Sequence, residues 1–331
     1  MKKILALVLA VLMVVSMAAC GAKTETAPET TAATEPAPEA KVYNVGICQL
    51  VQHPALDAAT QGFMDALSEK LGDNVKFDNQ NAQGDSATCS VITSGFVSNG
   101  VDLIMANATP ALLAAVSATD TIPVLGTSVT DFASALEVEA DANGALGMNA
   151  SGTSDGVPAQ AYVDCLLELV PDAKKVAIVY CSAEPNSVLQ ADNFIAAMGD
   201  KAECVVSTFA DSNDIQAVVT AAIEGVDAVY IPTDNTAASN MTIVANVCEP
   251  AGIPVIVGEE GMCSGGGLAT VSISYYNIGR VCGEMAYDIM VNGADVAKMP
   301  VGYDNAPVKK YNADYAAANN FTVPASYEAI G

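Results

Sequence analysis

The 331-residue chain contains a single histidine, His53, in the segment VQHPALD. An imidazole titrates near neutral pH, so it can act as a general base, a metal ligand or a polar contact to a bound molecule. A Ser-His-Asp or Cys-His hydrolase built from this chain would have to use His53. A zinc site with one histidine would need several thiolates brought together, and the sequence has no Cys-x-x-Cys pair. We expect no catalytic residue, no metal and no cofactor, and we expect His53 to contact a ligand.

Two other segments carry residue types that could serve catalysis. GEEG at 258–261 offers two carboxylates, as glycoside hydrolysis requires, but adjacent side chains on an extended segment point in opposite directions. CSGGGLA at 263–269 is rich in glycine but lacks the lysine of a phosphate-binding loop, so it indicates a turn. Neither segment favours an enzyme.

Polar side chains follow six apolar runs of the chain. The segments are VQHP, NATP and TSVTD in the first half, and SAEPNS, PTDNT and GEEG in the second. Ligands of open α/β sheets bind beyond the carboxyl ends of the strands. The candidate ligand-binding residues in these segments are therefore Gln52, His53, Thr109, Ser128, Thr130, Asp131, Asn186, Thr233, Asp234, Asn235 and Glu260. Threonine, serine and aspartate before helices are also ordinary N-caps, and for each of them capping alone stays open.

The apolar runs that precede these segments have the lengths of strands and alternate with helical patterns. Residues 42–50, 75–80, 101–107 and 122–128 predict four strands. Pro54 suits the first turn of a helix, and apolar residues recur at near-helical spacing after it, at Leu56, Ala59, Phe63, Leu67 and Leu71. Continuous apolar strands that alternate with helices indicate a parallel sheet covered on both faces.

The pattern then repeats. Three pairs of segments resemble each other, in the same order and at offsets of 131, 125 and 131 residues: 45–50 and 176–181, 100–109 and 225–234, 122–126 and 253–258. Chance similarity between apolar runs is the alternative, but the order and the spacing favour duplication. The fold class predicted is α/β, with two similar doubly wound parallel-sheet lobes joined by a hinge.

The N-terminus predicts export and anchoring. A cationic MKK followed by the apolar run 4–18 is typical of a signal peptide over 1–19. The run ends in MAACG, which resembles a bacterial lipobox and implies acylation of Cys20; an ordinary signal peptide with an incidental cysteine is the alternative. Residues 20–40 carry almost only Ala, Thr, Pro and Glu, so they predict a disordered tether. We expect a protein outside the cytoplasm, held to the membrane by lipid alone.

The charge of the chain excludes nucleic acid as a partner, and the positions of its cysteines predict the state of the thiols. Lys and Arg number 13 against 38 Asp and Glu, and the net charge of −25 would repel nucleic acid. Several of the eight cysteines after Cys20 lie inside apolar runs, where cysteine behaves as a small hydrophobic residue. We expect mostly free, buried thiols and a monomer.

Several motifs together resemble one family of ABC-transporter substrate-binding lipoproteins, whose best understood members bind tryptophan and other aromatic amino acids. The motifs are HPALDAATQGFMDAL, NAQGD, ATPALLAA, VTD, PTDNT, EEG and ATVSISYYNIG, spread from about residue 42 to the C-terminus. The resemblance implies a type I periplasmic-binding-protein fold in which the chain crosses between lobes three times. Its first lobe would be 41–147, completed by about 275–298, and its second 148–274, completed by about 299–331. Two segments depart from the family, LGMNASGTSD at 146–155 and GEEG, and both would face the cleft.

The function implied is delivery of a small zwitterion to an ABC permease and its ATPase by closure of the cleft. An L-amino acid, aromatic and with tryptophan favoured, is the expected ligand. Thr109 and Ser128 would hold its carboxylate, and Asp234 and Glu260 its ammonium. His53, with Tyr275 or Tyr276, would flank its side chain. A sensor subunit that docks on a receptor or kinase remains the alternative.

Overall fold

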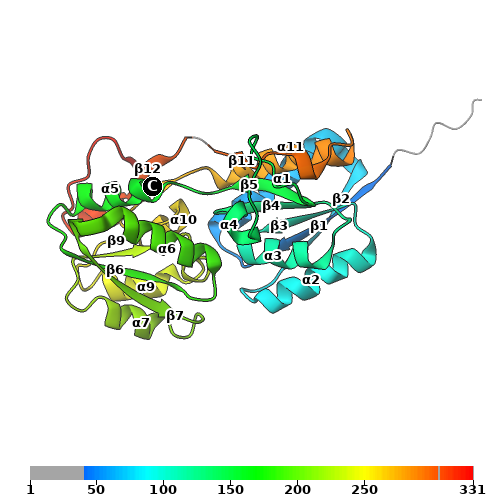
Figure 1. Cartoon of the computed structure of the whole chain (residues 1–331). Helices are drawn as coiled ribbons and strands as arrows, with labels where there is room; N and C mark the ends of the chain where they lie inside the picture. The colour runs from blue at the N-terminus through cyan, green and yellow to red at the C-terminus, as the bar shows by residue number, and fades with distance from the viewer. Residues whose placement is uncertain (1–40, 305, 331) are drawn as a thin grey trace, which may run out of the picture. The chain divides into compact units, whose positions relative to one another are not determined.

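The computed structural model describes residues 41–304 and 306–330, and residues 41–331 form one compact unit (Figure 1). The signal peptide, Cys20 and the tether lie outside the described residues, so these expectations stay predictions. No helix in the described part has the length and apolar character needed to cross a membrane.

The first sheet has six strands in the order β11-β5-β4-β3-β1-β2, all paired in parallel. Their bounds are β1 Tyr43–Gln49, β2 Val75–Asn81, β3 Leu103–Asn107, β4 Val124–Val129, β5 Ala150–Ser154 and β11 Gly302–Tyr303. Alternate residues of one strand enter different cores. Leu103 and Met105 pack in one core, whereas Ile104 and Ala106 pack in the other, so the sheet is buried on both faces.

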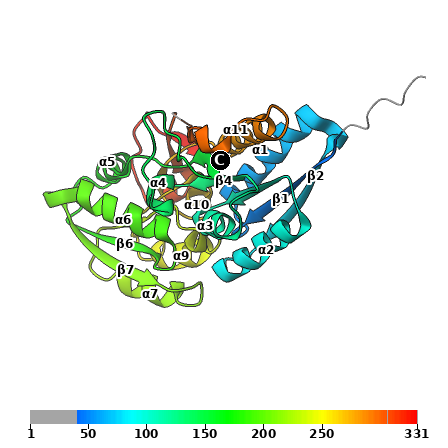
Figure 2. The ribbon, with the colours of Figure 1, turned by 45° about the vertical axis from the view of Figure 1, so that its right-hand side comes forward.

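Helices of the first lobe cover the two faces of this sheet. They are α1 Pro54–Leu71, α2 Ser86–Asn99, α3 Thr109–Ala118, α4 Phe132–Leu136 and α11 Tyr275–Met290. α1 and α11 lie side by side in both views (Figures 1 and 2). A Cβ on Gly62 would lie 2.1 Å from the carbonyl oxygen of Tyr276, and one on Gly279 2.0 Å from that of Ala59. Glycine at these two positions therefore lets the helices touch, which fixes their N-termini beside one another.

The second sheet has seven strands in the order β13-β12-β10-β9-β8-β6-β7. Their bounds are β6 Lys175–Cys181, β7 Glu203–Phe209, β8 Ala228–Ile231, β9 Val255–Val257, β10 Ala269–Ser272, β12 Val308–Asn312 and β13 Glu328–Ile330. Its helices are α5 Ala159–Leu169, α6 Pro185–Met198, α7 Ile215–Ala222, α8 Asn235–Ala238, α9 Met241–Cys248, α10 Glu260–Ser264 and α12 Ala313–Ala318. The pair β10–β12 is antiparallel, a departure from the purely parallel sheet expected.

The two sheets confirm the internal repeat. β4-β3-β1-β2 in the first and β9-β8-β6-β7 in the second follow the same order, and the three pairs of similar segments include β1 and β6, β3 and β8, β4 and β9. The predicted fold of two α/β lobes is therefore confirmed. Free thiols are also confirmed: all eight cysteines in the described part are unpaired, seven of them buried and Cys204 half-buried.

The lobe boundaries differ from those expected. The chain leaves the first sheet after β5 and returns between β10 and α11, and it leaves again between β11 and β12. β5 pairs with β4, so the first lobe runs past 147 to Ser154, and β11 pairs with β5 although 299–331 was assigned to the second lobe. The sequence of β5, ASGTS, contains no large apolar side chain and resembles a loop, and β11 is only two residues long.

Candidate functional site

The carboxyl ends of the strands of both sheets face one cavity between the lobes. In this arrangement of the lobes the cavity is nearly closed: its volume of about 10 Å³ is far below the range of about 300–1,000 Å³ for small-molecule sites, so a ligand can enter only when the lobes separate. Its lining residues are His53, Leu56, Ser128, Thr130, Asp155, Asn186, Thr233, Asp234, Asn235, Ala238, Glu259, Met262 and Tyr275. No Lys or Arg is among them, and eight of the twelve predicted binding residues are.

Most buried polar atoms without a partner lie at this cavity. Six such side-chain atoms occur among the described residues, and four belong to its lining: His53 Nδ1, Ser128 Oγ, Asp155 Oδ1 and Asn186 Oδ1. A buried polar atom left without a hydrogen bond costs about 1–3 kcal/mol. Four of them around one cavity make it the candidate place for a polar ligand or ordered water that supplies the missing partners.

His53 is the N-cap residue of α1 and is 5% exposed. Its Nε2 lies 3.2 Å from Asn235 Oδ1, on the opposite lobe. Asn235 Nδ2 donates to Glu184 Oε2 at 2.7 Å, which fixes the amide orientation, so Nε2 of His53 is the donor. Burial lowers the pKa of His53 below its usual value, so the ring is neutral and Nδ1 presents a bare lone pair to the cavity.

Ser128 occupies a strained position at the end of β4. Its φ of 56° lies in the left-handed region, and the β4–β5 register shifts between Gly126 and Val129. Such strain in a non-glycine residue persists only where the surroundings impose it, and it clusters at ligand sites. The Ser128 hydroxyl has no partner within the protein and can both donate and accept.

Asp155 directly follows β5 and was not among the predicted residues. Its Oδ2 accepts a hydrogen bond from the Tyr275 hydroxyl at 2.7 Å, and its Oδ1 has no partner. Burial raises the pKa of this carboxyl. Asp155 lies in LGMNASGTSD, one of the two segments that differ from the family pattern. Its place in the cavity depends on β5, which the sequence pattern did not reveal.

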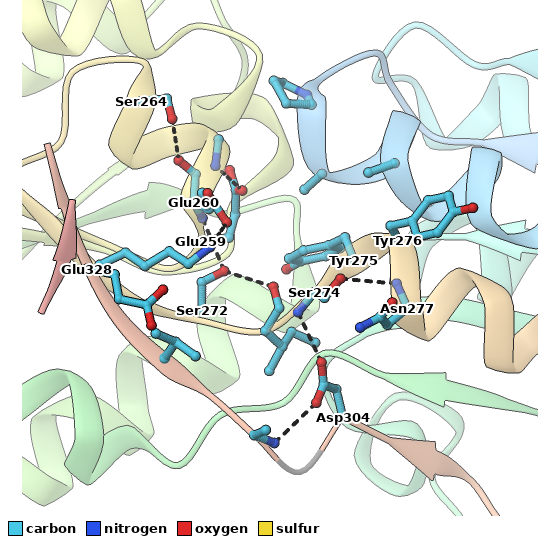
Figure 3. A pocket seen from close by; sticks show the side chains of 18 residues that line it. Glu259, Glu260, Ser264, Ser272, Ser274, Tyr275, Tyr276, Asn277, Asp304 and Glu328 are labelled. Carbon is cyan, nitrogen blue, oxygen red and sulfur yellow. Dashed lines mark hydrogen bonds and ion pairs between the residues drawn. The ribbon is translucent and has the colours of Figure 1, made fainter. Parts of the chain in front are cut away.

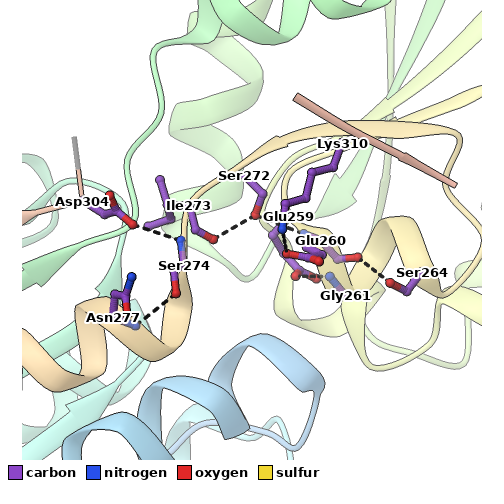
Figure 4. A network of polar contacts seen from close by, with 10 residues as sticks. All are labelled: Glu259, Glu260, Gly261, Ser264, Ser272, Ile273, Ser274, Asn277, Asp304 and Lys310. Carbon is purple, nitrogen blue, oxygen red and sulfur yellow. Dashed lines mark hydrogen bonds and ion pairs between the residues drawn. The ribbon is translucent and has the colours of Figure 1, made fainter. Parts of the chain in front are cut away.

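The acidic pair GEEG places the other glutamate in the cavity. Glu259 is 3% exposed and caps α10 by accepting from the backbone N–H groups of Gly261 and Met262 (Figure 4). Burial raises the pKa of Glu259 to about 7. Glu260, the predicted residue, instead forms an ion pair with Lys310 outside the cavity. Glu260 therefore does not line this cavity, because α10 begins at Glu260 and Glu259 is its N-cap; the expected contact of Glu260 to a ligand ammonium stays a prediction.

Glu260 lines a second, larger cavity of about 680 Å³ on the hinge side (Figure 3). Glu259 and Tyr275 line both cavities. The walls come from the start of α1, from α10 and from the two crossovers that precede α11 and β12. The volume of this outer cavity therefore depends on the angle between the two lobes.

Asp234 lies in the lining but its carboxylate already serves the backbone. Oδ1 accepts from Ala237 N–H as the cap of α8, and Oδ2 accepts from Cys181 N–H at 2.7 Å. Burial, with the nearby charge of Glu184, raises the pKa of Asp234 to about 8. The capping alternative therefore accounts for Asp234, and the structure gives it no free oxygen pointing to a ligand.

Gln190 of α6 connects the lobes beside the cavity and was also missed. Its Nε2 donates to Thr130 Oγ1 at 2.8 Å and to Thr233 Oγ1, and its Oε1 accepts from Thr233 N–H at 2.8 Å. Thr130 belongs to the first lobe and Thr233 to the second, so this side chain links the two in the present arrangement. Nothing in the sequence near Gln190 marks it, because it lies inside a helix, one turn after the polar segment.

Four predicted residues lie outside the cavity lining. Gln52 and Asp131 are exposed, and Asp131 caps α4 by accepting from Ser134 N–H. Thr109 is buried at the start of α3 and, with Asp131, lines a separate depression. Glu260 is the fourth. Tyr276, the alternative to Tyr275, is exposed and donates to Asp65.

The geometry does not form a hydrolytic site. Ser154 stands in a Gly-x-Ser-x-Gly sequence at 152–156, the spacing of a nucleophile elbow. Its hydroxyl donates to the Thr130 carbonyl and accepts from Gly156 N–H, and His53 bonds to Asn235 instead. Among the described residues no group of three or more His, Cys, Asp or Glu side chains is placed to hold a metal ion.

Comparisons with known proteins identify the family. The model of the ABC transporter substrate binding protein family matches residues 44–320. A tyrosine-binding protein of Clostridioides difficile (strain R20291) is 38% identical over 307 residues, 91% of this chain and 87% of that protein. A Streptococcus pneumoniae ABC domain solved with L-Trp is 32% identical, with a TM-score of 0.82 over 86% of this chain and 97% of that one. A ligand-free, open substrate-binding protein of Clostridium difficile is 36% identical, with a TM-score of 0.66 over 87% and 99% of the two chains. This chain belongs to the ABC transporter substrate-binding protein family, whose members bind substrates rather than transform them.

Proposed function

We propose that this protein is the extracytoplasmic, lipid-anchored binding subunit of an ABC importer and that it carries an aromatic L-amino acid, tryptophan or tyrosine. The observation that carries the proposal is the set of unpartnered atoms in the cavity. His53 Nδ1, Asp155 Oδ1 and Asn186 Oδ1 are hydrogen-bond acceptors, and only Ser128 Oγ can also donate. A ligand that satisfies them must therefore bring several donors.

An ammonium group fits this demand. It carries three N–H donors and no acceptor, and its charge is matched by the buried carboxyl of Asp155, with Glu259 nearby in the lining. The Asn186 orientation supports the count, because Asn186 Nδ2 donates to the Thr233 carbonyl and leaves Oδ1 as the atom without a partner.

The remaining lining suits an aromatic side chain. Leu56, Ala238 and Met262 supply apolar surface, and the rings of His53 and Tyr275 supply flat surface. Phenol and indole each bring one further hydrogen-bond donor, and Ser128 Oγ can accept it. The printed ligands of two relatives, tyrosine and L-Trp, support the same choice.

Closure of the lobes on the ligand is part of the proposal. His53–Asn235 and Thr130–Gln190 are contacts across the cleft, and the similarity to the L-Trp complex exceeds that to the open relative despite lower identity. Acylated Cys20 would tether this body to the membrane, which the intact mass of membrane-extracted protein tests.

Fluorescence tests the ligand directly, because the chain contains no Trp. Indole emission excited at long wavelength comes only from added L-tryptophan, and burial should shift it to the blue and raise its anisotropy. L-Tyrosine should compete. Asp155→Asn should weaken binding by at least tenfold, because it removes the charge that pairs with the ammonium, whereas Asp164→Asn on the surface of α5 should not. Unchanged indole emission together with no heat of binding for tyrosine would refute the aromatic ligand.

A further inference from the structure

We infer that the cavity recognises its ligand mainly through the ammonium group and that it also takes primary aromatic amines, which lack the carboxylate. The inference rests on the proposed function and concerns the same cavity. It comes from the balance of charge and of hydrogen-bonding groups around that cavity.

The lining contains three carboxyl groups and no cationic side chain. Asp155, Asp234 and Glu259 are each at most 5% exposed, and Glu184, which accepts hydrogen bonds from Asn235 and Thr236, lies close enough to Asp234 to raise the pKa of that carboxyl. The one imidazole is held neutral by burial, because the pKa of His53 is lowered. A ligand carboxylate would thus enter a buried site in which no cationic side chain matches its charge, and in which burial has already raised the pKa values of the neighbouring carboxyl groups.

Lys310, the cationic side chain that lines the outer cavity, is already engaged. Lys310 reaches toward α10 but pairs with Glu260, on the side of the outer cavity, as Figure 4 shows. Arg280 pairs with Glu69 at 2.6 Å on the surface of α1 and α11. Neither side chain lines the inner cavity. The carboxylate of a bound amino acid would therefore have to rely on hydroxyl and backbone donors.

The side-chain atoms without a hydrogen-bond partner also favour an ammonium over a carboxylate. Three of the four are acceptors, and Ser128 Oγ is the one that can donate to a carboxylate. An amine such as tyramine supplies an ammonium and a phenol hydroxyl, which is four donors in one molecule. Removal of the carboxylate therefore costs the ligand only one donor among these side-chain atoms, Ser128 Oγ, and removes a charge that no side chain of the lining neutralises.

The test is a panel of three ligands on the full-length, unmodified protein, measured by calorimetry at pH 7.5. The ligands are L-tyrosine, tyramine and 3-(4-hydroxyphenyl)propanoate, which keep both polar groups, only the ammonium and only the carboxylate. We expect tyramine to bind within tenfold of tyrosine and the propanoate to bind at least a hundredfold more weakly. The same ratios should hold at 0.5 M salt, because contacts in a buried cavity are little screened, whereas attraction to the acidic surface is lost.

Two substitutions distinguish the contacts of the ligand ammonium from those of the ligand carboxylate. Asp155→Asn should weaken tyrosine and tyramine equally, and Ser128→Ala should weaken tyrosine more than tyramine. Asp164→Asn, which removes one exposed charge, is the control and should change neither. If tyrosine binds and tyramine binds more than a hundredfold more weakly, the inference is overturned and the proposed function stands. If tyramine binds and neither aromatic amino acid does, the proposed function fails and the amine inference stands; if none of the ligands binds, both fail.

Discussion

Glu259 makes the stability of the folded protein depend on pH. Its carboxyl is buried beside the cavity, and the pKa is raised to about 7 from the usual 4.5. Between these values the folded protein binds more protons than the unfolded chain, so the free energy of unfolding falls as pH rises. The contribution of protonated Glu259 is complete below about pH 4.5 and is lost through pH 7, at most about 3 kcal/mol.

Glu259→Gln should therefore flatten the pH dependence of the melting temperature of the ligand-free protein between pH 5 and 8. Glu260→Gln is a close control, since it removes the same charge from the adjacent residue, which is partly exposed. The pKa values of Asp155 and Asp234 are raised as well, so the melting temperature of Glu259→Gln should still fall somewhat as pH rises. Equal slopes for the wild type and Glu259→Gln, from calorimetric scans, would show that Glu259 does not carry this proton.

At the scale of elements, much of the site follows from strand ends that the sequence pattern reveals. His53, Ser128 and Asn186 were found because each follows an apolar run in a repeated βα unit, and parallel strands bring their carboxyl ends to one edge. Asp155 was missed because β5 has no apolar signature. The choice between Glu259 and Glu260 depends on the residue at which α10 begins, and helix ends are the least certain part of any sequence pattern.

The link from α6 to the loop after β4 is also a property of elements. Gln190 bonds Thr130 of one lobe and Thr233 of the other, so the contact to Thr130 must break when the lobes separate. Gln190→Ala should speed ligand dissociation about fivefold to thirtyfold, the effect of losing about 1–2 kcal/mol, and should leave the association rate almost unchanged. Gln216→Ala, an exposed glutamine of α7, is the control. Stopped-flow indole fluorescence measures both rates, and a slower association with unchanged dissociation would contradict a role in holding the closed form.

At the scale of the whole molecule, binding should be a movement of two bodies about three crossovers. Each lobe has its own cores on both faces of its sheet, and the two lobes meet at the crossovers and through a small number of polar contacts. Each lobe can therefore keep its internal packing while the angle between the lobes changes, which is hinge closure.

Small-angle scattering should report this movement. The unpartnered atoms of His53, Asp155 and Asn186 come from both lobes and destabilise the closed form when no ligand satisfies them. The ligand-free protein should therefore be more open, with a larger radius of gyration, and saturating L-tyrosine or L-tryptophan should reduce it. In Asp155→Asn, which removes the charge that pairs with the ammonium, the reduction should need far higher ligand concentrations. A radius of gyration that is already small without ligand, and that a ligand bound by calorimetry does not change, would show that closure precedes binding and that the cavity is filled by another route.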